Sequence, residues 1–128
     1  MIERAMAVAA TVVIPAALRV LSLRATLTVC DRWPRTPPRT RVSGDTLARR
    51  VDRWLARGRG PWRPTCLIRA LVLYTLLRQH GYVPRLHIGT AGTVARFRAH
   101  AWVTLGGAPV GEAEAALAHH RQILAHGA

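Results

Sequence analysis

An apolar run occupies the middle of the chain, at residues 65–81. Its sequence, TCLIRALVLYTLLRQHG, leaves no continuous polar face, which predicts a helix that is buried on most sides. Thr65 offers a hydroxyl for the N-cap, and the pair His80-Gly81 is typical of a helix end. We therefore predict a core helix here, with the rest of the chain packed around it.

Segments with helical patterns precede this core helix. Residues 2–29 are rich in Ala, Val and Leu, which predicts one helix broken near Pro15, or two short helices. Residues 30–40 contain three prolines and predict an extended connector. Residues 43–57 carry one apolar stripe with arginines on the other side, which predicts an amphipathic helix with Ser43 at its start as a cap.

The pattern changes from a helical to a strand period after the core helix. Apolar and polar residues alternate over residues 82–89, and more clearly over residues 97–105. Both segments predict strands, with a turn at residues 90–93 between them. His100 lies on the face of the second strand that is opposite to its aliphatic residues.

The end of the chain predicts a turn, a short strand and a helix. The Gly-Gly pair at residues 106–107 predicts a tight turn, residues 108–110 a returning strand, and the Ala-rich residues 112–126 a C-terminal helix. Taken together, these elements predict an α+β fold. A central buried helix packs on a small antiparallel sheet, with additional N-terminal helices.

The chain length limits the number of domains, and the net charge limits the classes of partner. A chain of 128 residues supports one core, so we expect one domain, helical over residues 1–57 and with the core of the fold over residues 58–128. All 19 basic residues are arginine, and with six acidic residues they give a net charge of +13, which favours anionic partners. A basic module that binds nucleic acid is one alternative, but the arginines are scattered and no recognition motif is visible, so we expect no nucleic acid.

The apolar N-terminal segment, residues 5–29, has two interpretations. Residues 5–18 are too short for a membrane span and contain Pro15, and Glu3 argues against a signal peptide. The segment either packs on the core helix or docks on a membrane surface or a partner protein. Two cysteines without a convincing export signal predict free thiols in a reducing compartment, so we expect a cytoplasmic protein, with membrane association as the second interpretation.

Cys66 lies in the first turn of the predicted core helix. Unpaired N–H groups and the helix macrodipole favour a thiolate there, and a thiolate is a nucleophile; the alternative is a small buried apolar residue. His100 follows on a strand and Glu112 beyond the next turn. A cysteine, a histidine and an acid in this order are also found in papain-like and transglutaminase-like enzymes, where they act as nucleophile, base and orienting group.

Two longer motifs carry a family resemblance. The segments TCLIRALVLYTLLRQHGYVPRLHIGT and RFRAHAWVTLGGAPV resemble the lasso-peptide leader peptidases, a transglutaminase-like family that includes the microcin maturation protease. The resemblance covers about residues 60–112. It implies a cysteine peptidase that removes the leader from a ribosomally made precursor peptide, after which a separate ATP-dependent lasso cyclase forms the macrolactam. It also implies Cys66 as nucleophile, His100 as base and an acid at position 112.

The chain departs from the family pattern at two positions. The family usually has Asp where this chain has Glu112, and Glu is one methylene longer. Glu114, or a main-chain or water orienter, therefore stays open as the third member of the triad. Thr104 is the second departure, because an acid commonly follows the His-Ala-Trp-Val run. Acyl transfer to an amine, as in transglutaminases, is an alternative activity for the same catalytic parts.

Four other side chains near the predicted site are candidates for contact with the substrate: Trp62, Arg69, Arg98 and Trp102. The arginines suit acidic substrate residues, although a solvated surface position is the more typical role for either one alone. Trp102 shares the face of His100, where it either borders the site or packs in the core. The remaining histidines have no Cys or acid at metal-ligand spacing, so we expect no metal and no cofactor.

The residues ahead of Cys66 predict helices and a connector, without a small strand-rich leader-recognition domain. Family members that recognise their own leader carry such a domain. The chain therefore resembles the split form of the family, in which a separate leader-binding protein adds the leader as an edge strand and presents it to the peptidase. We expect three partners: the precursor peptide, this leader-binding protein and the lasso cyclase.

Overall fold

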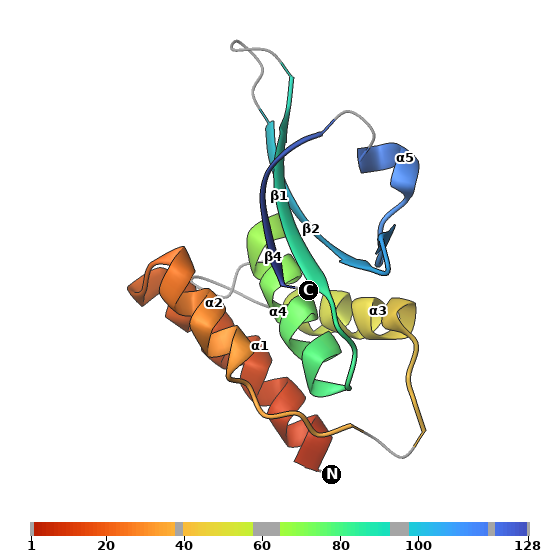
Figure 1. The fold of residues 1–128 in the computed structure, drawn as a ribbon. Helices are drawn as coiled ribbons and strands as arrows, with labels where there is room; N and C mark the ends of the chain where they lie inside the picture. Colours follow the sequence, from red (N-terminus) through yellow and green to blue (C-terminus); the bar gives the residue numbers. More distant parts are fainter. Residues whose placement is uncertain (1, 38–39, 58–64, 93–97, 118–119, 128) are drawn as a thin grey trace.

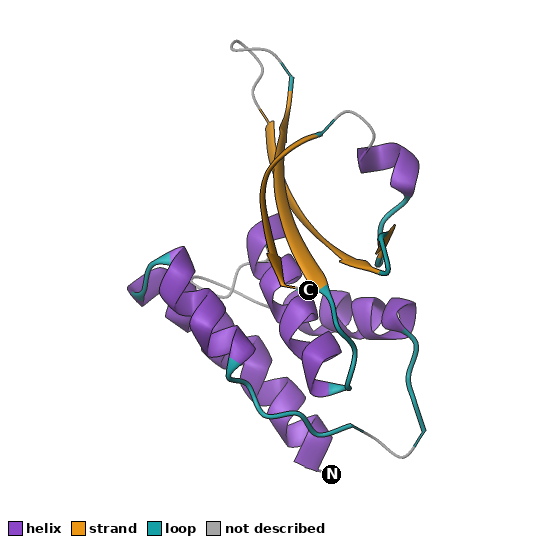
Figure 2. Ribbon diagram, in the orientation of Figure 1, coloured by secondary structure: helices purple, strands orange, loops and turns teal. Residues whose placement is uncertain are grey.

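The computed structural model describes residues 2–37, 40–57, 65–92, 98–117 and 120–127. Its elements, in chain order, are α1 (Ile2–Val20), α2 (Leu23–Asp31), α3 (Gly44–Leu55), α4 (Cys66–Gln79), β1 (Arg85–Ala91), β2 (Arg98–Leu105), β3 (Ala108–Pro109), α5 (Glu114–Leu117) and β4 (Arg121–Gly127). The four long helices gather in one part of the molecule and the sheet in the other (Figure 1, Figure 2). This is the α+β arrangement that the sequence predicts.

Helix α4 is the centre of the packing, as predicted. It contacts α1, α2 and α3 as well as strands β1 and β2 (Figure 1). Its side chains are buried almost continuously from Ala70 to Leu77. The Thr65 hydroxyl accepts a hydrogen bond of 3.2 Å from the Ile68 N–H, which is the predicted N-cap. The first turn of α4 is therefore held in place at the point where Cys66 stands.

The sheet is antiparallel, with the strand order β3-β2-β1-β4. In the β1–β2 pair, Leu86 lies opposite Val103, and both side chains belong to the core that α4 fills. His87 lies opposite Trp102. Because side chains alternate along a strand, this second pair occupies the other face of the sheet, together with His100. The sheet therefore has an aliphatic face toward α4 and a face of rings away from it.

Helix α3 confirms the predicted amphipathic helix. The Ser43 hydroxyl accepts a hydrogen bond from the Thr46 N–H at 3.2 Å. The apolar stripe that includes Leu47, Val51 and Leu55 is buried. Hydrophobic burial of this stripe fixes α3 against α4, so the polar side chains of α3 lie close to the start of α4.

The predicted break near Pro15 is wrong. Helix α1 continues through Pro15 and ends at Val20, and Ser22 then caps α2. A proline inside a helix removes one backbone hydrogen bond. Pro15 and its neighbour Ile14 are buried, and their packing in the core offsets that loss. The opposite side of α1 leaves Val8 and Val12 about half exposed, at 53% and 49%.

Two predicted loop boundaries also differ from the structure. Helix α2 includes Cys30 and Asp31, which the sequence assigned to the connector, because the Asp31 carboxylate accepts a hydrogen bond of 2.7 Å from the Tyr74 hydroxyl. This bond holds the last turn of α2 on α4. Thr90 and Ala91 belong to β1 rather than to a turn, since both pair with β2. No helix in the described ranges combines the length and apolar content that crossing a bilayer requires.

The predicted C-terminal helix over residues 112–126 is wrong. The structure has the short helix α5 and then β4, which pairs antiparallel with β1 and places Leu124 opposite Ile88. Alanine favours a helix locally, but the free edge of β1 carries N–H and C=O groups that need partners. Pairing with β4 provides those partners, and this tertiary contact overrides the local helix propensity.

Candidate active site

Cys66 stands in the first turn of α4 and is partly exposed. Its Sγ atom lies 4.0 Å from the main-chain oxygen of Ala99, on strand β2. A cavity of about 330 Å³ opens beside the thiol and has lining residues from α3 and from the start of α4. We call it the Cys66 cavity, and its lining residues are Asp52, Leu55, Ala56, Thr65, Cys66 and Arg69.

His100 and Glu112 form a direct pair. The Nε2 atom of His100 is 2.5 Å from Oε1 of Glu112, and both side chains are largely buried, at 25% and 19% exposure. A carboxylate only accepts hydrogen bonds, so Nε2 carries the proton and the lone pair of a neutral imidazole is on Nδ1. Glu114 is exposed at the start of α5 and has no hydrogen bond or ion pair with any described residue. Of the two acids that the sequence leaves open, Glu112 is the one in contact with His100.

The Cys66 thiol approaches strand β2, which carries His100, but it does not contact the His100 ring through a hydrogen bond among the described residues. Ala99, which faces the Cys66 sulfur, immediately precedes His100 in β2. Within the described part of the chain, no hydrogen bond joins Sγ of Cys66 to the His100 ring, and Nδ1 of His100 has no hydrogen-bond partner. The structure therefore brings His100 and Glu112 together and leaves the basic nitrogen Nδ1 available.

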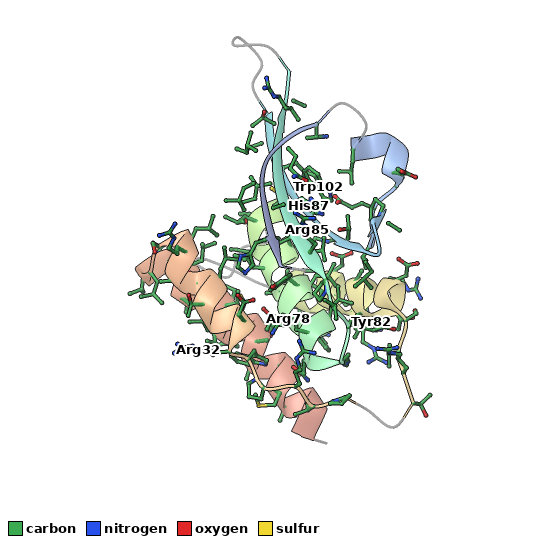
Figure 3. All side chains as sticks on the ribbon, viewed as in Figure 1. Arg32, Arg78, Tyr82, Arg85, His87 and Trp102 are labelled. Carbon is green, nitrogen blue, oxygen red and sulfur yellow. The ribbon has the colours of Figure 1, made fainter. Side chains whose placement is uncertain are left out.

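Trp102 lies between two histidine rings. Its indole stacks on His87, with ring centroids 5.3 Å apart, and on His100, with centroids 6.0 Å apart. Figure 3 shows Trp102 and His87 next to one another beside the sheet. Gly89 makes room for this stack, because a Cβ atom there would lie only 2.7 Å from the Trp102 ring. His120 adds a fourth ring, 5.4 Å from His100. The orientation of the His100 imidazole is thus set by packing as well as by Glu112.

His87 is held at both ring nitrogens. Nδ1 donates to the Oε1 atom of Gln122, and Nε2 accepts from the Thr104 hydroxyl at 2.7 Å. Thr104 is one of the two positions at which the sequence departs from the motifs that it resembles. Its hydrogen bond to His87 fixes the end of the ring stack that is farther from His100. An acid at the same position would carry charge into a buried site, since Thr104 is only 8% exposed.

Arg69 connects the start of α4 to the segment that carries Glu112. Its guanidinium donates to both carboxylate oxygens of Asp52, at 2.6 and 3.3 Å, and to the Gly111 carbonyl at 3.3 Å. The Gly111 N–H donates to the Asp45 carboxylate at 3.3 Å. We call Asp52, Arg69 and Gly111 the arginine clamp. The clamp ties Gly111, the residue before Glu112, to both α3 and α4. Its member on α4, Arg69, is three residues after Cys66.

The clamp requires glycine at position 111. The backbone there has a φ of +72°, and a Cβ atom would come within 2.6 Å of an Arg69 nitrogen and 2.7 Å of Ala48. A left-handed conformation and the absence of a side chain are both needed for this approach. The guanidinium of Arg69, which the sequence assigned to substrate contact, is therefore held by protein groups.

Two of the predicted substrate-contact residues cannot be placed as side chains. Trp62 lies outside the described residues, and Arg98 begins β2 but its side chain is not among those described. Sequence reasoning missed His120 and Gln122 because it assigned them to a helix. His87 had a detectable signal, since the strand alternation put it on the polar face. The bond between Asp52 and Arg69 joins residues 17 positions apart, and no local pattern indicates it.

A helix that opens on a cysteine and packs on an antiparallel sheet bearing a histidine–carboxylate pair is an arrangement suited to thiol chemistry on acyl groups. Residues 7–125 match the profile of the Transglutaminase-like superfamily, and the chain belongs to this superfamily. Membership is compatible with a cysteine peptidase or with an acyltransferase. The searches of curated proteins and of solved structures gave no significant match.

Proposed function

We propose that this protein is a cysteine peptidase that removes the leader peptide from a lasso-peptide precursor. The observation that carries the proposal is the 2.5 Å contact between His100 and Glu112, on the strand that the Cys66 thiol approaches, in a chain of the transglutaminase-like superfamily. The choice of substrate is supported by the resemblance of the motifs around Cys66 and His100 to lasso-peptide leader peptidases.

The proposed reaction begins with proton transfer from the Cys66 thiol to Nδ1 of His100. The resulting thiolate attacks the carbonyl carbon of the scissile peptide bond and forms a tetrahedral intermediate. The intermediate collapses to a thioester as His100 gives its proton to the leaving amine. Water then attacks the thioester, His100 accepts its proton, and the thiol leaves with a proton from His100. Glu112 keeps the proton on Nε2 throughout and stabilises the imidazolium.

The start of α4 also supports the proposal through its backbone. Thr65 satisfies the N–H of Ile68, whereas the Cys66 N–H has no acceptor among the described residues. First-turn N–H groups have no partner within their own helix. The Cys66 N–H is therefore the proposed first donor to the oxyanion of the tetrahedral intermediate.

A separate leader-binding protein belongs to the proposal as the partner that delivers the substrate. Such a protein raises the effective concentration of the scissile bond at Cys66 without new contacts at the site. The peptidase alone is then slow. Adding the partner accelerates cleavage only for a precursor whose leader the partner binds.

The test is a time course of precursor cleavage, followed by mass spectrometry, with and without the leader-binding protein. The expected products are an intact leader with a free carboxylate and a core peptide with a free amine. A control precursor whose leader does not bind the partner separates recruitment from chemistry. Transfer of the leader acyl group to an added amine, in place of hydrolysis, would reassign the protein to the acyltransferases. No processing under any condition would refute the proposed substrate.

A further inference from the structure

A second and larger cavity, of about 480 Å³, lies between α1, α3 and the C-terminal part of α4. Its apolar lining includes Ala7, Leu47 and Leu76, one from each of these helices, and all three are buried. Three arginines line the same cavity: Arg50 and Arg53 of α3, and Arg57, which follows the end of this helix. We call it the arginine cavity. It is lined by none of the residues that line the Cys66 cavity.

No described carboxylate pairs with any of the three arginines. Ion pairs among the described residues involve other groups, and none includes Arg50, Arg53 or Arg57. Arg50 and Arg53 are three residues apart and share one side of α3, and Arg57 follows four residues later, just past the helix end, so the three span about 10 Å at the helical rise of 1.5 Å per residue. A row of cations without a partner among the described carboxylates, beside an apolar cavity lining, complements a ligand that carries several negative charges and an apolar group.

The shape of this surface favours a peptide over a lipid headgroup. A single phosphate engages cations around one point, whereas charges spread over about 10 Å match carboxylates on neighbouring turns or alternate residues of one chain. The arginines also border a cavity rather than a protruding face. We propose that the arginine cavity binds an acidic peptide segment that contains apolar side chains.

The position of the cavity links this binding to the candidate active site. Trp54 and Arg57 line the arginine cavity, and Leu55 and Ala56, between them in sequence, line the Cys66 cavity. The last turn of α3 therefore separates the two cavities. A helix is about 10 to 12 Å wide, and an extended peptide of about four residues spans that distance. A role as a substrate subsite rests on the proposed peptidase function, whereas binding of an acidic peptide does not.

The experiment measures binding first, using the full chain with Cys66→Ser to prevent turnover. The probe is a fluorescently labelled 12-residue peptide of Glu and Leu, and its matched control has Gln in place of every Glu. We expect the Glu peptide to bind about tenfold more tightly than the Gln peptide, and the difference to shrink as salt is raised. Equal affinities for the two peptides would overturn the proposal.

Variants of the three cavity arginines test whether the peptide binds in the arginine cavity. Replacing Arg50, Arg53 and Arg57 together with Gln should weaken binding of the Glu peptide about tenfold. The matched control replaces Arg24, Arg49 and Arg85 together with Gln, because it removes the same three charges from exposed residues that do not line the cavity. Equal losses in the triple variant and the control would mean that net charge, not this cavity, attracts the peptide. A second measurement uses vesicles of phosphatidylglycerol. If the original protein binds these vesicles, the triple variant does not, and neither binds the peptide, the cavity is a lipid site and the proposal is refuted.

Cleavage is measured separately with Cys66 present. If the proposed function and the subsite both hold, the triple variant raises the KM for a cleaved precursor and leaves kcat near its original value. Binding of the Glu peptide by a protein that cleaves nothing would refute only the peptidase function. Cleavage with an unchanged KM in the triple variant would overturn the role of the arginine cavity as a substrate subsite.

Discussion

The two cysteines of this chain stand at opposite ends of their helices and in opposite surroundings. Cys30 is fully buried in the last turn of α2, and burial raises the pKa of its thiol from 9.0 to about 11. Cys66 is partly exposed in the first turn of α4, beside a cavity of about 330 Å³. The same functional group is a packing residue in one region and accessible for chemistry in the other, because the fold and not the residue type sets its environment.

The polar groups around the two cysteines differ in the same way. Near Cys30, the Asp31 carboxylate accepts hydrogen bonds from Tyr74 at 2.7 Å and from His126 at 2.8 Å, and so joins α2, α4 and β4. Burial, and then the hydrogen bond to Asp31, raises the pKa of Tyr74 well above its usual range. That region is a structural junction. Near Cys66, the polar groups instead border a cavity or leave one nitrogen of His100 available.

Replacing each cysteine by alanine, which removes the sulfur, should separate the two regions most strongly. Cys66→Ala removes the proposed nucleophile, and we expect precursor cleavage to fall by at least about 10⁴-fold while the fold is kept. Cys30→Ala should retain activity and lower the free energy of unfolding by about 1 kcal/mol, since it only removes packed sulfur. Cleavage time courses and thermal unfolding measure both variants. Cleavage by Cys66→Ala would exclude Cys66 as the nucleophile.

Substitutions in the pair of His100 and Glu112 should cause the next largest loss of cleavage. His100→Ala should remove nearly all cleavage, because the base is lost, whereas Glu112→Gln should leave a measurable remainder, because an orienting group contributes less than the base that it orients. Glu112→Asp introduces the residue that lasso-peptide leader peptidases usually have there, and it should keep more activity than Glu112→Ala. The comparison uses kcat/KM of purified variants, with Glu114→Ala as the control. A loss in Glu114→Ala that equals the loss in Glu112→Ala would assign the acid to position 114.

The arginine clamp should affect turnover more than binding. Arg69→Gln frees the Glu112 segment from α4, and we expect kcat to fall about ten- to a hundredfold with a smaller change in KM, because a displacement of about 1 Å has effects of this size. Arg78→Gln is the matched control on the same helix. It loses contacts with Asp31 and should lower the unfolding temperature without lowering kcat. An Arg69→Gln effect confined to KM would instead assign Arg69 to substrate contact.

The ring stack should respond to a single methyl group. Gly89→Ala places a Cβ atom 2.7 Å from the Trp102 ring, so we expect a loss of about 1 to 3 kcal/mol in the free energy of unfolding and a partial loss of activity. Thr90→Ala, at the neighbouring position, is the control and should have a small effect. Urea unfolding and the near-ultraviolet circular dichroism of Trp102 report the change. A Gly89→Ala protein with unaltered stability would show that Trp102 does not need the space above Gly89.

The smallest expected effect is the loss of folding stability at alkaline pH that the Cys30 thiol causes. Its raised pKa means that the folded state holds the thiol proton more tightly than the unfolded chain does. This contribution to stability is present below pH 9 and is lost as the pH rises toward about 11. At pH 10 the loss should be about 1 kcal/mol. Tyr74 acts in the same direction, so the measurement is the difference between the original protein and Cys30→Ala in urea unfolding at pH 8 and 10. Identical pH dependence in the two proteins would contradict the burial of Cys30 as a neutral thiol.

The sequence by itself determined the elements whose signals are local. The apolar run of α4, its Thr65 cap and the stripe of α3 predict helices that the structure confirms, because capping and the helical period act within a few residues. Alternation likewise predicted β2 with His100 and Trp102 on one face. The candidates Cys66 and His100 follow from their positions within these elements.

Only the tertiary structure decided the contacts that depend on distant parts of the chain. Strand β4 forms because β1 offers an open edge, although its own residues favour a helix. The stack of Trp102 on His87 depends on strand register, which no single strand specifies, and the bond of Arg69 to Asp52 depends on how α3 crosses α4. The contact of Glu112 rather than Glu114 with His100 follows from the held Gly111, so it too is set by packing and not by spacing in the sequence.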